Sequence, residues 1–172
     1  QLTHEENGVF GAQFAHDDNS VFYHVSKDKD AEDKKDKDDK DKKPEATVIT
    51  RMKYKSDSGP GPYGLLKEKF TAVKSIGIKS GEAETVLSGE ENFTLYDVFD
   101  GGLIYATDKS DNPDFNFAQK LYMRIHGEDK LIRGDAGFMK AEMSPDGSYI
   151  LMTVMTRKFK NATHPHIEIY DV

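Results

Sequence analysis

The stretch GFMKAEMSPDGSYILMTVMT at residues 137–156 reads as a strand, a short polar turn and a second strand. Apolar and polar side chains alternate along both arms, with the period of two that a half-buried β-strand requires. At the turn, Pro145 presets the backbone angle of the first turn position, and Gly147 easily takes the left-handed conformation that directs the chain back. The stretch therefore predicts a β-hairpin.

Two other stretches of the chain repeat this plan. They are GVFGAQFAHDDNSVFYHVS at 8–26 and NFTLYDVFDGGLIYATD at 92–108. The turn residues Asp100 and Asp146 lie 46 positions apart, and Leu121 and Ile167 in later strands share that spacing. Separate landmarks with one period indicate an internal repeat.

A repeat of roughly 40 to 50 residues with about four short strands per unit is typical of a β-propeller blade. Helical repeats are disfavoured, because no window keeps a helical stripe of apolar residues. We therefore predict an all-β fold, a partial β-propeller of about three four-stranded antiparallel blades, forming one domain over 1–172. The expected strands lie at 9–15, 20–26, 70–79, 82–88, 92–98, 102–108, 119–126, 128–133, 137–143, 149–156 and 166–172.

The first blade carries a long insertion, because Asp17 precedes Asp100 by 83 positions rather than 46. In the tract at 27–45, 17 of 19 residues are charged, so we expect it to be solvated and mobile. The segment 46–69 alternates and then becomes rich in Gly and Pro, which predicts a β-arm projecting from the blade. The predicted divisions are blade one at 1–89, blade two at 90–134 and an incomplete blade three at 135–172.

The composition excludes several classes of protein. The chain has no Cys, so it can form neither a disulfide framework nor a thiolate metal site. The net charge is −7, and acidic residues are interleaved with the basic residues of the tract at 27–45, which argues against nucleic acid as a partner. No stretch approaches the roughly 20 apolar residues of a membrane span, and the first residues carry no signal-peptide pattern. We therefore expect a cytoplasmic protein that binds neither nucleic acid nor membrane.

Histidines and acidic clusters predict no site of their own. His164 and His166 flank a proline, but a zinc or copper site needs further ligands, so an ordinary loop is favoured. His16 beside Asp17 is more typical of a turn than of a catalytic pair. Asn92 begins a glycosylation motif that we interpret as incidental. One acidic cluster lacks the glycine and distal glutamate of a calcium loop, and its members are Asp108, Asp111, Asn112 and Asp114. We predict no metal and no cofactor.

Two motifs together resemble a known family. SPDGSYILMTV at 144–154 resembles the blade signature of Tol-type and peptidase propellers. ATVITRMKYKSDSGPG at 46–61, placed after the first hairpin and a charged linker, resembles the N-terminal propeller of acylaminoacyl peptidases in the prolyl oligopeptidase family of serine peptidases. This chain departs from the usual pattern at Met143, where an aromatic is common, and at HDDN in positions 16–19.

The resemblance implies an enzyme in which the propeller admits short peptides to a separate α/β-hydrolase domain of the same parent chain. In that family a serine on a G-x-S-x-G turn belongs to a Ser, Asp, His triad, and this chain contains no such motif. We therefore predict no catalytic residue here and no activity for the chain alone. Its ends fall inside blades, so we expect it to be a slice of a longer protein.

The predicted arm holds the polar residues of most functional interest, Arg51, Lys53 and Tyr54. Alternation places Arg51 and Lys53 on one face, where they could meet a substrate carboxylate or the hydrolase domain. A solvated hairpin face is the alternative interpretation.

Two other functions stay open. One is a noncatalytic propeller scaffold for protein–protein interaction, and the other is an exported Tol-type module, which would need a signal sequence upstream of Gln1. A partial propeller would also leave strand edges open. We therefore expect a homo-oligomer that forms through those edges.

Overall fold

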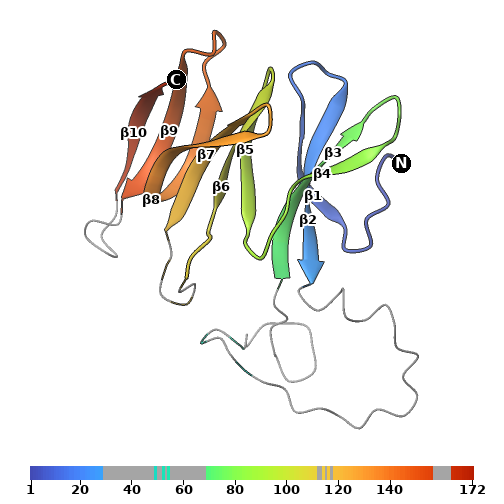
Figure 1. Ribbon diagram of the computed structural model, residues 1–172, viewed down its shortest axis with the longest axis horizontal. Helices are drawn as coiled ribbons and strands as arrows, with labels where there is room; N and C mark the ends of the chain where they lie inside the picture. Colours follow the sequence, from blue (N-terminus) through green and yellow to red (C-terminus); the bar gives the residue numbers. More distant parts are fainter. Residues whose placement is uncertain are drawn as a thin grey trace.

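A computed structural model describes residues 1–28, 49, 52, 54, 69–111, 114, 116, 118–156 and 164–172. Its described part is all-β, with ten strands and no helix (Figure 1). The strands are β1 (Val9–Phe14), β2 (Ser20–Asp28), β3 (Lys69–Gly77), β4 (Ala83–Leu87), β5 (Phe93–Phe99), β6 (Gly102–Thr107), β7 (Gln119–Ile125), β8 (Glu128–Met143), β9 (Tyr149–Thr156) and β10 (Pro165–Asp171). The all-β prediction is confirmed. Apart from β8, the expected strands agree with these bounds to within two residues.

The described residues include no helix that could cross a membrane. Most of the charged tract at 27–45 and most of the arm at 46–69 lie outside the described residues.

The first sheet has the order β1-β2-β3-β4, and all its pairs are antiparallel. Its longest pairing joins β2 to β3, from Ser20 opposite Gly77 to Asp28 opposite Lys69. The last residue of β2, Asp28, is therefore paired directly with the first residue of β3, Lys69. Residues 29–68 lie between these two residues in the sequence.

The second sheet has the order β10-β9-β8-β7-β6-β5. Its strand β8 is one continuous strand of 16 residues, whereas the sequence predicts separate strands at 128–133 and 137–143. The expectation of a break was wrong because Asp135, with φ of 49°, turns the chain locally while the flanking residues stay paired. Ala136 is paired with Gln119 of β7 on one side and with Thr156 of β9 on the other. The strand thus exchanges partners without ending.

The second sheet folds over along β8. The hydroxyl of Tyr96 in β5 donates to the carbonyl of Phe138 at 2.7 Å, and the amide of Met143 donates to Asp97 Oδ2 at 2.7 Å. These contacts bring β5 beside the second half of β8, although β6 and β7 lie between them in the sheet order. The enclosed core consists of Ile104, Ala106, Leu121, Met123, Ala136, Phe138, Ala141, Ile150, Met152 and Val154.

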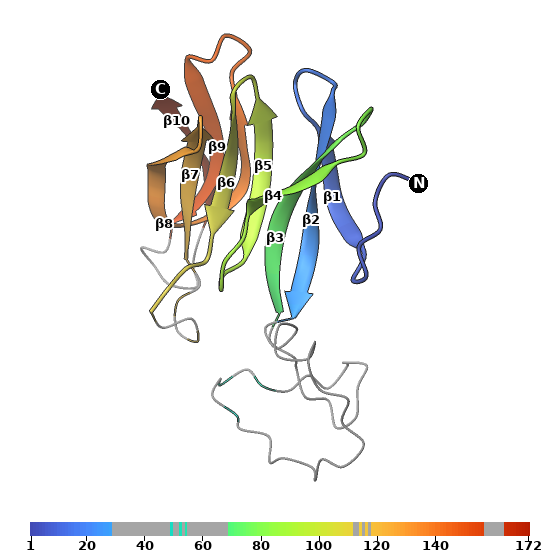
Figure 2. The ribbon, with the colours of Figure 1, turned by 45° about the vertical axis from the view of Figure 1, so that its right-hand side comes forward.

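The two sheets lie side by side in both ribbon views (Figures 1 and 2). A second core packs between them, formed by Ala15, Val73, Leu87, Phe93, Leu95, Val98, Leu103 and Tyr105. The opposite face of the first sheet is also buried, with Tyr23 1% exposed and Val25 3% exposed. Glu5 from the N-terminal segment lies over this face, where its Oε1 accepts from Tyr23 Oη at 3.2 Å and from Lys74 Nζ at 2.6 Å.

The turn chemistry predicted from the sequence is confirmed. Gly101 and Gly147 have φ of 76° and 73°, in the left-handed region where other residues are strained. Asp146 Oδ1 accepts hydrogen bonds from the hydroxyl of Ser144 and the amide of Ser148, which closes the turn. The division into three blades remains a prediction, since the structure has two sheets.

Candidate functional site

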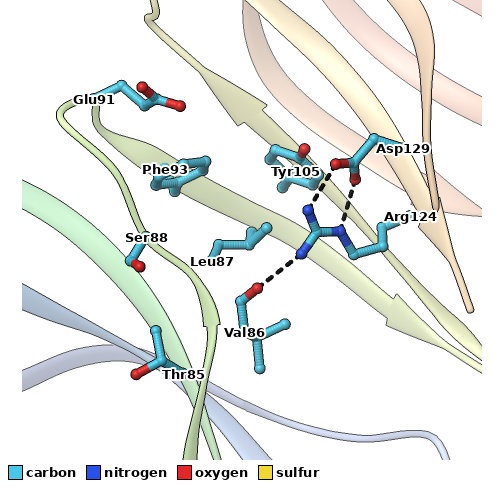
Figure 3. Close-up of a pocket in the computed structure, with 9 residues that line it drawn as sticks. All are labelled: Thr85, Val86, Leu87, Ser88, Glu91, Phe93, Tyr105, Arg124 and Asp129. Carbon is cyan, nitrogen blue, oxygen red and sulfur yellow. Dashed lines mark hydrogen bonds and ion pairs between the residues drawn. The ribbon is translucent and has the colours of Figure 1, made fainter. Parts of the chain in front are cut away.

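A polar cavity of about 300 Å³ opens between the edge of the first sheet and the face of the second (Figure 3). The first sheet contributes residues of β4 and the segment after it, and the second sheet contributes β5, β6, β7 and the start of β8. The lining residues are Thr85, Val86, Leu87, Ser88, Glu91, Phe93, Tyr105, Arg124 and Asp129.

Arg124 is the central side chain of this cavity. Its Nε donates to Asp129 Oδ1 at 2.7 Å and its Nη2 donates to Oδ2 at 2.6 Å, a paired geometry that is the strongest that Arg and a carboxylate form. Its Nη1 donates to the carbonyl of Val86 at 2.8 Å. Arg124 and Asp129 are direct cross-strand partners of β7 and β8, while Val86 belongs to β4. The guanidinium therefore links the two sheets, and we call this group of three residues the arginine clamp.

Aromatic rings pack against the guanidinium of the clamp. The guanidinium carbon of Arg124 lies 5.7 Å from the centre of the Tyr105 ring, within the range of a cation–π contact. Tyr105 in turn stacks on Tyr122, with ring centres 5.5 Å apart and planes 17° apart, and also contacts Phe93. These rings fix the position of the guanidinium beside the cavity.

The protonation states of the clamp are fixed at neutral pH. Hydrogen bonds from Arg124 hold the pKa of Asp129 below its usual 3.8. Hydrogen bonds to Asp129 raise the pKa of Arg124. Burial, together with the Asp129 carboxylate, raises the pKa of Tyr105 far above 10. Arg124 is thus a cation, Asp129 an anion and Tyr105 a neutral phenol, and none of the three changes charge near pH 7.

The arrangement of the clamp suits anchoring of the two sheets to each other. The cavity lining also offers hydroxyls at Thr85, Ser88 and Tyr105 and a second carboxylate at Glu91. Its one guanidinium is already bound to a carboxylate and a backbone carbonyl.

A second polar contact joins the sheets at His24, whose side chain is almost fully buried. Its Nε2 accepts the amide hydrogen of Leu95 in β5 at 2.9 Å, and Phe10 stacks on the ring at 5.2 Å. Nδ1 is buried and has no well-formed hydrogen bond in the described structure. Burial lowers the pKa of His24, and the backbone of Phe10 and Gly11 opposes only part of that shift. The histidine is therefore neutral, with its proton on Nδ1.

Of the three site residues predicted from the sequence, the structure describes only Tyr54, which does not line this cavity. Arg51 and Lys53 fall outside the described residues, and Tyr54 is 44% exposed. One contact of the arm is described: the amide of Met52 donates to Asp114 Oδ2 at 3.1 Å. A role for the three predicted residues therefore stays a prediction.

The acidic cluster and the histidine pair have structural partners. Asp108 accepts hydrogen bonds from the amide and the side chain of Asn92, at 2.7 and 2.8 Å. Asn92 Oδ1 accepts from the amide of Thr71, so this asparagine connects the two sheets at their ends. His166 Nε2 lies 2.9 Å from Glu168 Oε1. Among the residues that the structure describes, no three His, Asp or Glu side chains are grouped to hold a metal ion. His16 lies in the turn between β1 and β2.

The clamp and the role of His24 were not predicted from the sequence, although part of the signal was present. Arg124 and Asp129 flank the predicted turn between 119–126 and 128–133, so their cross-strand pairing follows from the strand register. The contact with Val86 and the bond from Leu95 to His24 join segments 38 and 71 residues apart, and no local pattern predicts them.

Comparison with known proteins supports a fold class for this chain but does not show its family. No family model matches the sequence, and no curated protein matches it. The structure is similar to the acylaminoacyl peptidase of Pyrococcus horikoshii, with a TM-score of 0.62 and 15% identity over 95% of this chain and 25% of that chain. It is also similar to TolB from Acinetobacter baumannii, with a TM-score of 0.52 and 14% identity over 99% of this chain and 31% of that chain. The chain thus spans about a quarter to a third of these propeller-containing neighbours, and a propeller fold is supported.

Proposed function

We propose that this chain is a noncatalytic part of a β-propeller in a serine peptidase of the acylaminoacyl peptidase type. In the full-length enzyme the propeller would gate the access of short peptides to a separate α/β-hydrolase domain. The observation that carries this proposal is the likeness to the Pyrococcus horikoshii acylaminoacyl peptidase over 95% of the chain. The motifs at 46–61 and 144–154 support it independently.

The packing of the strands fits a row of blades. In this proposal the first sheet is one blade, and β5–β7 with the first half of β8 form a second. The second half of β8, with β9 and β10, belongs to a third. The arginine clamp and His24 then join the first two blades, and such contacts would help to hold the propeller rigid around the entrance to the hydrolase domain.

The arm residues would have a role in the full-length enzyme. We propose that Arg51 and Lys53 contact a substrate carboxylate or the hydrolase domain, with Tyr54 beside them. Arg51→Ala should then raise KM or lower kcat/KM for short acidic peptides and leave neutral peptides unaffected. Lys79→Ala, which removes an exposed cation from the turn between β3 and β4, serves as the matched control. Unchanged kinetics would remove this role.

The proposal is tested by the coding DNA that follows Val172. Reading at least ~250 further codons covers a hydrolase-sized domain. A G-x-S-x-G turn followed in order by Asp and His is the expected result, and the encoded protein should then hydrolyse short acylated peptides faster than folded proteins. Further blades followed by a stop codon would overturn the peptidase proposal.

The second candidate is a noncatalytic propeller scaffold that binds another protein. The likeness to TolB over 99% of the chain favours it, because it supports the propeller without reference to a peptidase. An exported module of this kind would need a signal sequence upstream of Gln1. The cytoplasmic location stays a prediction, and upstream coding sequence would test it.

A further inference from the structure

Glu91 is the one charged residue of the cavity lining that takes no part in the arginine clamp. Figure 3 shows Glu91 beside Phe93 at one end of the cavity. The clamp lies at the other end, beside Tyr105. The side chain of Glu91 is only 15% exposed, so most of its contact with water is lost. A carboxylate in this position calls for a partner that donates hydrogen bonds to it.

The ion pair that the structure gives Glu91 is a loose one. Lys109 Nζ lies 3.7 Å from Glu91 Oε2, which is longer than a hydrogen bond. The side chain of Lys109 is 73% exposed, and a pair with so exposed a lysine contributes little. Within the described part of the chain, no cation lies closer to this carboxylate. A donor inside the cavity can therefore take the place of Lys109.

The charges of the lining favour a cation as that donor. The lining has two carboxylates, Glu91 and Asp129, and one guanidinium, Arg124, so its formal net charge is −1. The guanidinium already donates to Asp129 through Nε and Nη2 and to a backbone carbonyl through Nη1, which leaves it little capacity for an anion. The hydroxyls of Thr85 and Ser88 are neutral and can accept further hydrogens from a cationic ligand.

The size and walls of the cavity narrow the class of cation. A volume of about 300 Å³ suits a small organic molecule. The rings of Phe93 and Tyr105 line the cavity, and aromatic faces attract organic cations. A metal ion is disfavoured, because the described residues include no group of three His, Asp or Glu side chains placed to hold one.

We propose that this cavity binds a small primary ammonium ion, whose N–H groups donate to the carboxylate of Glu91 in place of Lys109. Free amines and the amino termini of short peptides share this chemistry. The inference goes beyond the proposed function and does not depend on it. The nine lining residues all lie between 85 and 129, so the chain contains the whole site and neither of its ends takes part.

Titration of the 172-residue chain with n-butylammonium chloride, followed by nuclear magnetic resonance, tests the site. The amide signals of Ser88 and Glu91 should shift and reach saturation, whereas n-butanol, which has the same chain without the charge, should leave them in place. Glu91→Gln should weaken binding about tenfold or more, because a hydrogen bond to a charged group is lost. Glu90→Gln is the matched control, since it removes a neighbouring exposed carboxylate outside the lining, and it should leave the affinity unchanged.

Lys109→Ala distinguishes a binding site from a structural ion pair, and it does not require Glu91→Gln to fold. Lys109 competes with the ligand, so its removal should tighten binding of n-butylammonium. Alanylalanine amide should compete with n-butylammonium if amino termini are accepted, while its N-acetylated form should not; competition by neither restricts the site to free amines. Equal weakening by Glu91→Gln and Glu90→Gln, weaker binding in Lys109→Ala, or shifts with n-butanol as large as those with the ammonium would overturn the proposal.

Discussion

Lowering the pH from 7.5 to 5 should weaken the contact between the two sheets, because His24 is buried there in its neutral form. Its Nε2 accepts the amide hydrogen of Leu95 at 2.9 Å. Protonation would place an N–H opposite that amide and a positive charge in a site only 6% exposed. Titratable side chains on the neighbouring strands are engaged elsewhere: Lys74 with Glu5, Tyr96 with Phe138, and Asp97 with Met143.

The size and sign of the effect follow from the pKa. Burial puts the folded-state pKa of His24 below the ordinary 6.5, so the unfolded chain binds its proton first as the pH falls. The stability contributed by neutral His24 is therefore complete above about pH 6.5 and is lost as the pH falls toward the folded-state pKa. Within that window the free energy of unfolding should fall by up to about 1.4 kcal/mol per pH unit.

Urea unfolding at pH 7.5, 6.5 and 5.5 measures this loss. The chain has five other histidines, so the wild type is compared with His24→Gln, whose amide oxygen can accept the same hydrogen without titrating. The pH-dependent loss should be smaller in His24→Gln, while His126→Gln, at an exposed turn, should follow the wild type.

Parallel pH profiles for the wild type and His24→Gln would refute the reasoning. If His24→Gln fails to fold, nuclear magnetic resonance of the wild-type ring decides the matter. The ring should carry its proton on Nδ1 and titrate below pH 6.5, and a proton on Nε2 would contradict the described contact.

Three further substitutions test the contacts that hold the sheets, each measured by urea unfolding at pH 7. Asp129→Asn removes the charge that binds Arg124 and should cost about 1 kcal/mol, a modest value because both side chains are partly exposed. Asn92→Ala removes the side chain that bonds to both sheets and should cost roughly 1–2 kcal/mol. Tyr96→Phe leaves a backbone carbonyl without its hydroxyl donor and should also cost roughly 1–2 kcal/mol. Burial raises the pKa of Tyr96 to about 12, so Tyr96→Phe should remove absorbance change from the alkaline end of a phenol titration. Losses below about 0.3 kcal/mol would mean that these bonds exchange freely with water.

Most of the secondary structure could be predicted from the sequence because its determinants are local. Alternation defines β9 and β10 without reference to the rest of the molecule, and the Ser144–Ser148 turn closes through its own side chains. The continuity of β8 could not be predicted. Gly134 and Asp135 read as a turn, and only the neighbouring strands β7 and β9 keep the backbone paired through them.

The candidate site was less predictable than the fold. The sequence indicated that His24 lies in an alternating strand, but its partner Leu95 is 71 residues away. The pairing of Arg124 with Asp129 could have been predicted from the strand register. The contact of Arg124 with Val86 could not, because it depends on how the two sheets pack. Contacts of this kind depend on the arrangement of whole sheets, which no short window of sequence contains.

The shared strand β8 has a consequence for how the molecule comes apart. Because its halves belong to the hydrogen-bond ladders of β7 and β9 in turn, neither half of the second sheet can fray without disturbing the other. The first sheet is joined to the second by side-chain contacts and one short connection, residues 88–92, with no shared strand. The two sheets should therefore behave as separate cooperative units, with the six-stranded one opening as a whole. The boundary between dynamic units would then lie between the sheets and not between the sequence repeats.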